Sequence, residues 1–293
     1  MSMKNGSFLI TDLDNTLYDW FDVWYKSFRA MLTAMVEMSG IKEEVLIPEM
    51  KKVHEQHGTA EYLRLIQEIP LLAAKHPGED VTKIYVRAVQ AYRDARQQNL
   101  RLYPSVLDTL KDIKSKGTFI VGYTESQSFY SEYRVKALGL DGIIDCLYSS
   151  PTHDLPDNLP PDQEHFYPLS YDKLEHTARR RTPKGAVKPS PDVLLSILKD
   201  LRADREEAIY VGDDKSKDIV MAQAAGVTDV HAAYGVVHSK KDYDLLRAVT
   251  NWPKEQVEKQ KRDSTIIPSY ELRSSFSELL SLFNFSHFAP RSK

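Results

Sequence analysis

Five short apolar runs recur along the chain, and most of them are followed by a segment with helical periodicity. They are "SFLIT", "TFIVGY", "IIDCLY", "AIYVG" and "VTDVHAAY". Near-continuous apolar runs of this length suit strands that are buried on both faces. The segments "SFYSEYRVKALG" and "DIVMAQAAG" each end on a glycine, which commonly terminates a helix. This alternation of strands and helices predicts an α/β fold with a doubly wound parallel sheet.

The stretch from Trp20 to Arg101 departs from this alternation, because it contains no clear strand. Apolar residues recur at helical spacing in "DWFDVWYKSFRAMLTAMVEM", and further helices are expected at about 43–57, 59–74 and 80–98. We therefore predict an all-helical module, residues 20–101, inserted into a core formed by residues 1–19 and 102–293. The last strand of this core is expected near "STIIPSYEL", before a helix at 274–283.

A second irregular segment, residues 149–187, lies within the predicted core. It carries five prolines between Pro151 and Pro168 and then the basic run Arg179-Arg180-Arg181. This composition predicts a long loop with at most one short helix near 170–180. The arginines are either a solvated run or a feature that attracts an anionic ligand.

The composition is that of an ordinary soluble globular protein. The chain has 293 residues, 28% of them charged, with a net charge of −3. This charge provides no global field for nucleic acid or anionic lipid, so we expect neither as a partner. The single cysteine, Cys146, excludes an internal disulfide, and the N-terminus has no apolar stretch long enough for a signal or a membrane span. We predict a cytoplasmic protein, and its oligomeric state is left open.

Asp12 and Asp14 follow the first predicted strand with one leucine between them. If the strand continues, both carboxylates lie on the same side of it. Two crowded carboxylates are unfavourable unless a cation or a shared proton relieves their repulsion. Mg²⁺ prefers carboxylate, carbonyl and water oxygens, so a magnesium site is one explanation. A plain turn is the other, since aspartate and asparagine are common turn residues.

Two later polar residues, Thr124 and Lys188, also lie at the end of a predicted strand or just before a predicted helix. Thr124 follows the second apolar run and can hold a phosphate there, although Thr124 to Gln127 also fits a capping box. Lys188 lies just before a helix start at Ser190 and can point at an anion or into solvent.

The fourth run ends on an acidic segment, "GDDKSKD", which begins a predicted helix. Its acidic residues can satisfy the helix dipole or bind magnesium, and they are Asp213, Asp214 and Asp218.

These four features, in this order and each at the end of a strand or the start of a helix, resemble the motifs of the haloacid dehalogenase-like hydrolases. The matching elements are "DLDNT", Thr124, Lys188 and "GDDKSKD", and the resemblance covers about 7–19, 102–150 and 184–235. It implies a Rossmann-like core of the phosphatase branch, with a helical cap inserted after the first motif. It also implies a magnesium-dependent phosphomonoester hydrolase that acts through an aspartyl-phosphate on a small phosphorylated metabolite, of the nucleotide, sugar or glycolate phosphate type.

The resemblance also implies roles for individual residues. Asp12 would be the nucleophile, and Asp14 would be the general acid and base, with its backbone carbonyl on the metal. Mg²⁺ would be held by Asp12, Asp14 and Asp213, with Asp218 in the outer shell or steadying Lys188. The candidates for holding the phosphoryl group are Thr16, Thr124, Glu125 and Lys188. The spacing from Asp213 to Asp218 is one residue longer than is common in the family, which leaves the role of Asp214 open.

By the same resemblance, the helical module would close over the site and select the leaving group. Its candidate substrate-binding residues are Lys26, Arg29, His54, His57 and Arg64. His54, His57 and Glu61 could also share a helix face and mimic a zinc site, although Gly58 interrupts the helix, and a solvated or substrate-facing surface is the preferred interpretation.

Two other functions fit the same sequence. A phosphomutase would use the same nucleophile, and a catalytically silent small-molecule binding protein could keep the fold. A dehalogenase is disfavoured, because that chemistry needs neither the acid at Asp14 nor a metal.

Overall fold

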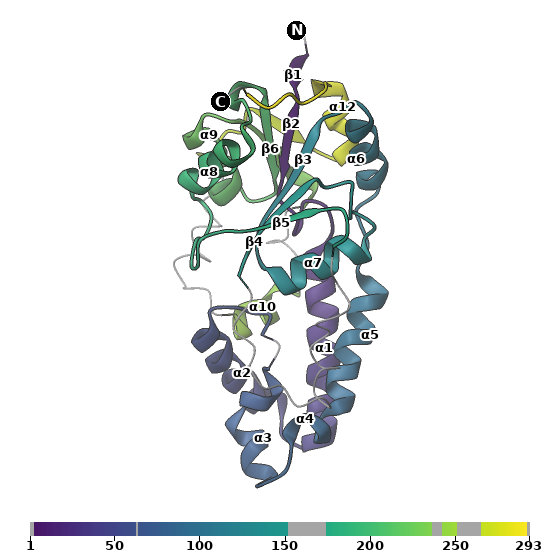
Figure 1. Cartoon of the computed structure of the whole chain (residues 1–293). Helices are drawn as coiled ribbons and strands as arrows, with labels where there is room; N and C mark the ends of the chain where they lie inside the picture. Colours follow the sequence, from purple (N-terminus) through teal and green to yellow (C-terminus); the bar gives the residue numbers. More distant parts are fainter. Residues whose placement is uncertain (1–2, 63, 152–173, 236–241, 251–264, 292–293) are drawn as a thin grey trace. The chain divides into compact units, whose positions relative to one another are not determined.

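The computed structural model describes residues 3–62, 64–151, 174–235, 242–250 and 265–291 (Figure 1). These residues form two compact units. The first, which we call the core unit, contains the described residues of 1–19, 101–236 and 263–293. The second, the helical unit, contains those of 20–100 and 237–262. No helix in the described part of the chain is long and apolar enough to cross a membrane.

The core unit is built on a sheet in which every pair of neighbouring strands is parallel. Among the described residues it has seven strands in the order β5-β4-β3-β2-β6-β7-β8. The strands are β2 Phe8–Thr11, β3 Phe119–Gln127, β4 Cys146–Ser150, β5 Ala178–Arg181, β6 Ala208–Gly212, β7 Thr228–Ala232 and β8 Tyr270–Leu272. The predicted α/β fold with a doubly wound parallel sheet is confirmed. The strand order reverses at β2, which is where such sheets bind ligands.

The register of β2 explains how distant residues come together. Thr11, the last residue of β2, pairs with Gly122 on one side and with Val211 on the other. Because all three strands run in the same direction, the residues after these positions meet at one edge of the sheet. Thr124 and Asp213 each lie two residues beyond the paired positions, where Thr124 contacts Asp14 and Asp213 lies close to Asp12.

Helices cover both faces of this sheet. In Figure 1, α8 and α9 lie on the opposite side of the strands from α6 and α12. Phe8 and Ile10 of β2 are fully buried in an apolar cluster that includes residues of α8 and α9. The helices and helical turns of the core unit are α6 Val106–Ser115, α7 Ser128–Ala137, α8 Pro191–Leu201, η3 Arg205–Glu207, η4 Lys215–Ile219, α9 Val220–Ala225, η5 Ala233–Gly235, η7 Phe276–Glu278 and α12 Leu279–Leu282.

The C-terminal region consists of shorter helices and strands than the sequence predicts. The last strand of the large sheet, β8, falls within the expected segment. The helix expected at 274–283 is instead η7 followed by the short α12, and the chain then continues as β9 Phe283–Phe285. β9 pairs in parallel with β1 Lys4–Gly6, which forms a separate two-stranded sheet.

The basic run predicted as loop is in fact a strand at the sheet edge. β5 pairs in parallel with β4, and all four of its residues are exposed. Arg179 and Arg181 form ion pairs with Glu132, and Arg180 pairs with Asp200. Charged side chains are usual on edge strands, where they discourage pairing with other chains. Such a strand lacks the apolar run by which the others were found. No helix forms at the described residues 174–180, and 152–173 lie outside the described residues.

The helical unit is dominated by α1 Trp20–Ser39, which packs against α5 Val86–Asn99. The apolar stripe of α1 is buried, as expected for core residues. The other elements of residues 20–100 are α2 Glu43–His57, η1 Ile66–Glu68, α3 Pro70–Lys75 and α4 Val81–Ile84. The prediction of a single helix at 59–74 is wrong. Gly58 ends α2 in the left-handed conformation, and the next α-helix begins only at Pro70.

A later segment also belongs to the helical unit. The sequence assigned all of 102–293 to the core, whereas α10 Tyr243–Val249 packs on α2. The Tyr243 ring lies 5.4 Å from that of Phe21, and the Val249 carbonyl oxygen lies 2.8 Å from Nδ1 of His54. An apolar helix face can pack in either unit equally well, so periodicity alone does not tell where α10 belongs.

Candidate active site

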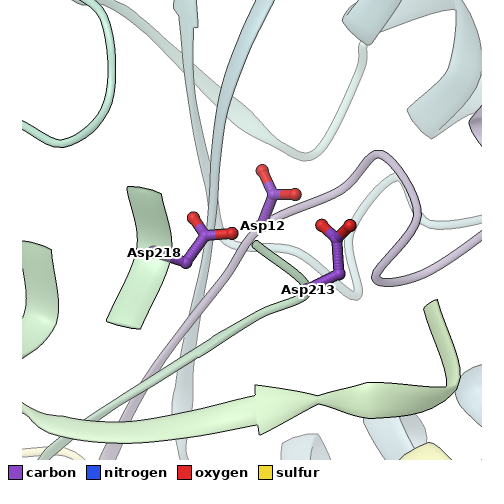
Figure 2. Close-up of side chains that lie close together, drawn as sticks. All are labelled: Asp12, Asp213 and Asp218. Carbon is purple, nitrogen blue, oxygen red and sulfur yellow. The ribbon is translucent and has the colours of Figure 1, made fainter. Parts of the chain in front are cut away.

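Three aspartates meet at the carboxyl edge of the central strands (Figure 2). Asp12 follows β2, Asp213 follows β6, and Asp218 lies in η4. One carboxylate oxygen from each lies within 4.8 Å of the others. The cluster combines the first and the last of the four sequence motifs, as the parallel topology requires.

Asp12 is buried beside a cation. Its Oδ1 accepts a hydrogen bond of 2.6 Å from Nζ of Lys188. Burial raises the pKa of Asp12 to about 8, because it disfavours the charged carboxylate, and repulsion from Asp218 and Asp14 adds to burial while Lys188 opposes it. The pKa of Asp213 is also raised, well above its ordinary value, first by burial and then by the charges of Asp12 and Asp218.

Lys188 is not a solvated surface lysine, since it is buried in the core unit. Its Nζ donates to Asp12 and, at 2.9 Å, to Oδ1 of Asp218, and it lies over the rings of Tyr123 and Tyr210. Burial alone would lower the pKa of Lys188, but the two carboxylates outweigh burial and hold this pKa well above the ordinary value. Lys188 therefore stays charged and fixed beside the Asp12 carboxylate.

The long spacing between Asp213 and Asp218 is accommodated by a π-helical turn. In η4, the backbone N–H of Val220 donates to the carbonyl of Lys215, five residues earlier. A π-turn absorbs one residue more than an α-turn, so Asp218 still reaches the cluster. Asp214 is the N-cap of this turn, and its side chain accepts from the backbone N–H groups of Ser216 and Lys217. Its carboxylate thus serves as a helix cap.

Asp218 is held at both of its oxygens. Oδ1 accepts from Lys188 and from the Tyr210 hydroxyl, and Oδ2 accepts from the Asp214 backbone N–H. Its Cγ lies only 2.3 Å from where a Cβ on Gly212 would be, so a glycine is required there. Asp218 therefore fixes Lys188 in place, one of the two roles expected for it.

Asp14 points to a different group of residues. Its Oδ2 accepts from the hydroxyls of Thr124, at 3.1 Å, and Ser126, at 2.6 Å. Its Oδ1 accepts from the Tyr18 hydroxyl and from Arg134, and its carboxylate does not belong to the metal-binding cluster. Thr124 does not cap a helix, because β3 continues to Gln127 and α7 begins at Ser128 with no side-chain cap. The capping-box interpretation is therefore wrong.

The two remaining candidates for phosphate binding, Glu125 and Thr16, contact residues of the other motifs. The Glu125 carboxylate accepts from the backbone N–H of Lys188 and from Nζ of Lys217, so it ties three of the four motifs together. The Thr16 hydroxyl lies 3.5 Å from Oδ2 of Asp12 and 3.4 Å from Oδ1 of Asp213.

The charge balance of the cluster fits a divalent cation. Three buried or half-buried carboxyl groups face the single positive charge of Lys188, so with all three ionised the cluster carries net negative charge in a site shielded from water. Carboxylate oxygens are the ligands that Mg²⁺ prefers, and a bound cation would offset both the burial and the mutual repulsion that raise the pKa values of Asp12 and Asp213. The donor set therefore suits magnesium.

In the helical unit, four of the five predicted substrate-binding residues lie beside an acidic side chain of the same unit. Lys26 pairs with Asp22, Arg29 with Glu43, His57 with Glu68, and Arg64 lies 4.0 Å from Glu68, while His54 is buried. His54, His57 and Glu61 do not form a metal-binding cluster in the part of the chain that the structure describes.

A family model for haloacid dehalogenase-like hydrolases matches residues 8–226, which include all four motifs. The chain belongs to this family. The resemblance seen in the sequence is thereby confirmed, and so is the prediction that the chain is a hydrolase.

Individual proteins resemble this chain at low sequence identity. The glyceraldehyde 3-phosphate phosphatase of Methanopyrus kandleri is 24% identical over 230 residues, covering 78% of this chain and 84% of that protein. A 2-haloacid dehalogenase from Pseudomonas syringae pv. Tomato DC3000 matches with a TM-score of 0.54 at 18% identity, over 94% of this chain and 97% of that one. A predicted phosphoglycolate phosphatase from Haemophilus somnus matches with a TM-score of 0.51 at 18% identity, over 96% and 99%. The two structures show that the fold is that of the family.

The sequence did not reveal the residues that donate hydrogen bonds to the acidic side chains Asp14, Glu125 and Asp218 of this hydrolase. These are Tyr18, Ser126, Arg134, Tyr210 and Lys217. For Arg134 a signal exists in the sequence. It lies four residues after Tyr130, so the two side chains share one face of α7, and both are buried. A charged residue on a buried helix face requires a partner of opposite charge.

Proposed function

We propose that this hydrolase is a magnesium-dependent phosphomonoesterase that works through an aspartyl-phosphate on Asp12. The observation that carries the proposal is the Asp12 carboxylate at the end of the central strand, fixed by Lys188 and grouped with Asp213 and Asp218. A carboxylate held in this way can attack a phosphorus atom placed in line with it.

The proposed reaction has two displacements. An oxygen of Asp12 forms a bond to phosphorus while the bond to the leaving oxygen breaks, and Asp14 gives that oxygen a proton. Water then attacks the same phosphorus and gives its proton to Asp14, and the bond to Asp12 breaks as phosphate leaves. Lys188 and Thr124 would bind the phosphoryl oxygens throughout.

Asp12 and Asp213 would hold the magnesium ion, together with the backbone carbonyl of Asp14. When bound, this ion offsets the repulsion between the carboxylates and the phosphoryl group and stabilises charge in the transition state.

The proposed substrate is a small phosphorylated metabolite. The relative named as a glyceraldehyde 3-phosphate phosphatase supports this class. We propose that the helical unit acts as the cap that selects the leaving group. We also propose a cytoplasmic location, because the single cysteine of the chain is a buried free thiol.

The test is phosphate release from a panel of phosphomonoesters, with and without magnesium. Asp12→Asn should lower the turnover at least about 1,000-fold, because it removes the nucleophile. Asp112→Asn is the matched control, since Asp112 lies on α6 with 45% of its side chain exposed and pairs with Lys116 one turn later. Equal turnover in Asp12→Asn, or activity that survives chelation, would refute the mechanism. Phosphoryl transfer to a second hydroxyl without phosphate release would identify a phosphomutase instead.

A further inference from the structure

Arg134 is a buried cation directly beside the proposed acid and base. It lies on α7 with 2% of its side chain exposed, and its guanidinium donates to Oδ1 of Asp14 at 3.3 Å and to the Ser126 hydroxyl at 3.2 Å. Its guanidinium carbon lies 5.4 Å from the ring centre of Tyr130 and 5.9 Å from that of Tyr18. Burying a guanidinium is costly unless a carboxylate accompanies it, and Asp14 supplies one. The two side chains therefore constrain each other.

Among the described residues, four side chains donate to the Asp14 carboxylate, and they fall into two kinds. Thr124 and Ser126 carry small hydroxyls at the end of β3 that can rotate. On the proposed function, Thr124 turns to the phosphoryl group when substrate binds. Tyr18 and Arg134 are both buried and fixed by packing, so they keep their bonds to Oδ1.

We propose that Arg134, together with Tyr18, is a positioning residue that holds the Asp14 carboxylate within reach of the leaving-group oxygen. This inference rests on the proposed function. A proton donor acts only within hydrogen-bond reach of the oxygen it protonates, and a displacement of about 1 Å can cost about 100-fold in rate. Loss of Arg134 should therefore impair proton transfer more than phosphate binding.

The dependence on the leaving group distinguishes this role from a structural one. Phenyl phosphate and p-nitrophenyl phosphate have similar shapes, but only the first has a leaving oxygen that depends strongly on protonation. The quantity to compare is kcat/KM, because it covers the steps up to release of the leaving group and excludes the later attack of water. A fall in the amount of folded enzyme lowers both values equally, so their ratio is unaffected.

Arg134→Met should lower kcat/KM at least about 10-fold for phenyl phosphate and less than about 3-fold for p-nitrophenyl phosphate. Tyr18→Phe keeps the ring and removes one donor, and it should change the ratio in the same direction. Arg134→Lys should recover part of the loss. Arg180→Met is the matched control, because Arg180 is exposed on β5 and pairs with Asp200. It should leave both values unchanged.

A double-mutant cycle on the best ester of the panel provides a second measurement. If Arg134 acts through Asp14, adding Arg134→Met to Asp14→Asn should lower kcat/KM less than about twofold further. Equal losses on both aryl esters, a gain with phenyl phosphate, or additive losses in the cycle would overturn the role of Arg134 and leave the hydrolase proposal standing. Absence of hydrolysis with every ester would refute the proposed function itself.

Discussion

His54 of the helical unit should make the stability of that unit depend on pH. Its Nδ1 lies 2.8 Å from the carbonyl oxygen of Val249, so Nδ1 carries the proton and Nε2 does not. Nε2 is buried with no hydrogen-bond partner among the described residues. Protonating it would place a charge in an apolar cluster, beside the ring of Phe28. Burial accordingly lowers the pKa of His54 to about 4 from its ordinary 6.5.

The sign and the size of the effect follow from this shift. Because the folded-state pKa lies below the unfolded one, the unfolded chain takes up the proton first as the pH falls. The stabilisation is complete above pH 6.5 and is lost progressively as the pH falls from 6.5 towards 4. Between pH 7 and pH 5 this loss amounts to about 2 kcal/mol. At a urea dependence of about 3 kcal/mol per molar, the midpoint of unfolding would fall by about 0.7 M.

The assay is urea unfolding of the wild type and of His54→Asn, followed by tryptophan fluorescence at several pH values. Trp20 and Trp24 lie in the helical unit, so the signal reports on its unfolding. Asparagine offers an N–H to the Val249 carbonyl but does not titrate. The difference in unfolding free energy between wild type and variant should therefore shrink by about 2 kcal/mol from pH 7 to pH 5. His287→Asn is the control, because His287 is exposed.

A difference that stays constant over this range would refute the reasoning, since it would mean that His54 takes up its proton equally in the folded and unfolded states.

Two further predictions concern α10 and the acidic cluster. Leu246→Ala should destabilise the helical unit by about 2–4 kcal/mol in the same urea assay, because Leu246 is fully buried, whereas Leu195→Ala on the exposed face of α8 should change stability by less than about 0.5 kcal/mol. Mg²⁺ at 100 times its dissociation constant should raise the unfolding free energy of the wild type by about 2.7 kcal/mol and that of Asp213→Asn far less. Equal stabilisation of the two proteins would argue against the cluster as the metal site.

The sequence predicted well wherever a strand carries its own apolar run. β2, β3 and β6 were found in this way, and their parallel order brings Asp12, Thr124 and Asp213 together without further information. The spacing of Asp213 and Asp218 was recognised as unusual, but the π-turn that accommodates it depends on backbone hydrogen bonds that composition does not specify.

The features that were missed depend on contacts between distant parts of the chain. The direction of the Asp14 side chain is set partly by Arg134, which lies 120 residues later. β5 carries charge where the other strands carry apolar residues, and its ion partners Glu132 and Asp200 lie on α7 and α8. The packing of α10 was missed because an apolar helix face does not identify its partner.

On the proposed role of the helical unit as the cap, the place of α10 bears on how substrate preference can change in this lineage. A cap encoded by one uninterrupted stretch can be exchanged as a cassette, by cutting the gene at two points. Here the helical unit also includes α10, encoded some 140 residues downstream of residue 100, and Leu246 and Val249 of α10 are fully buried in it. A graft of residues 20–100 alone would place a foreign helical module against the original α10, whose apolar residues fit the surface of the original α2. Recombination between relatives must therefore transfer both stretches together, which favours gradual change by point substitution.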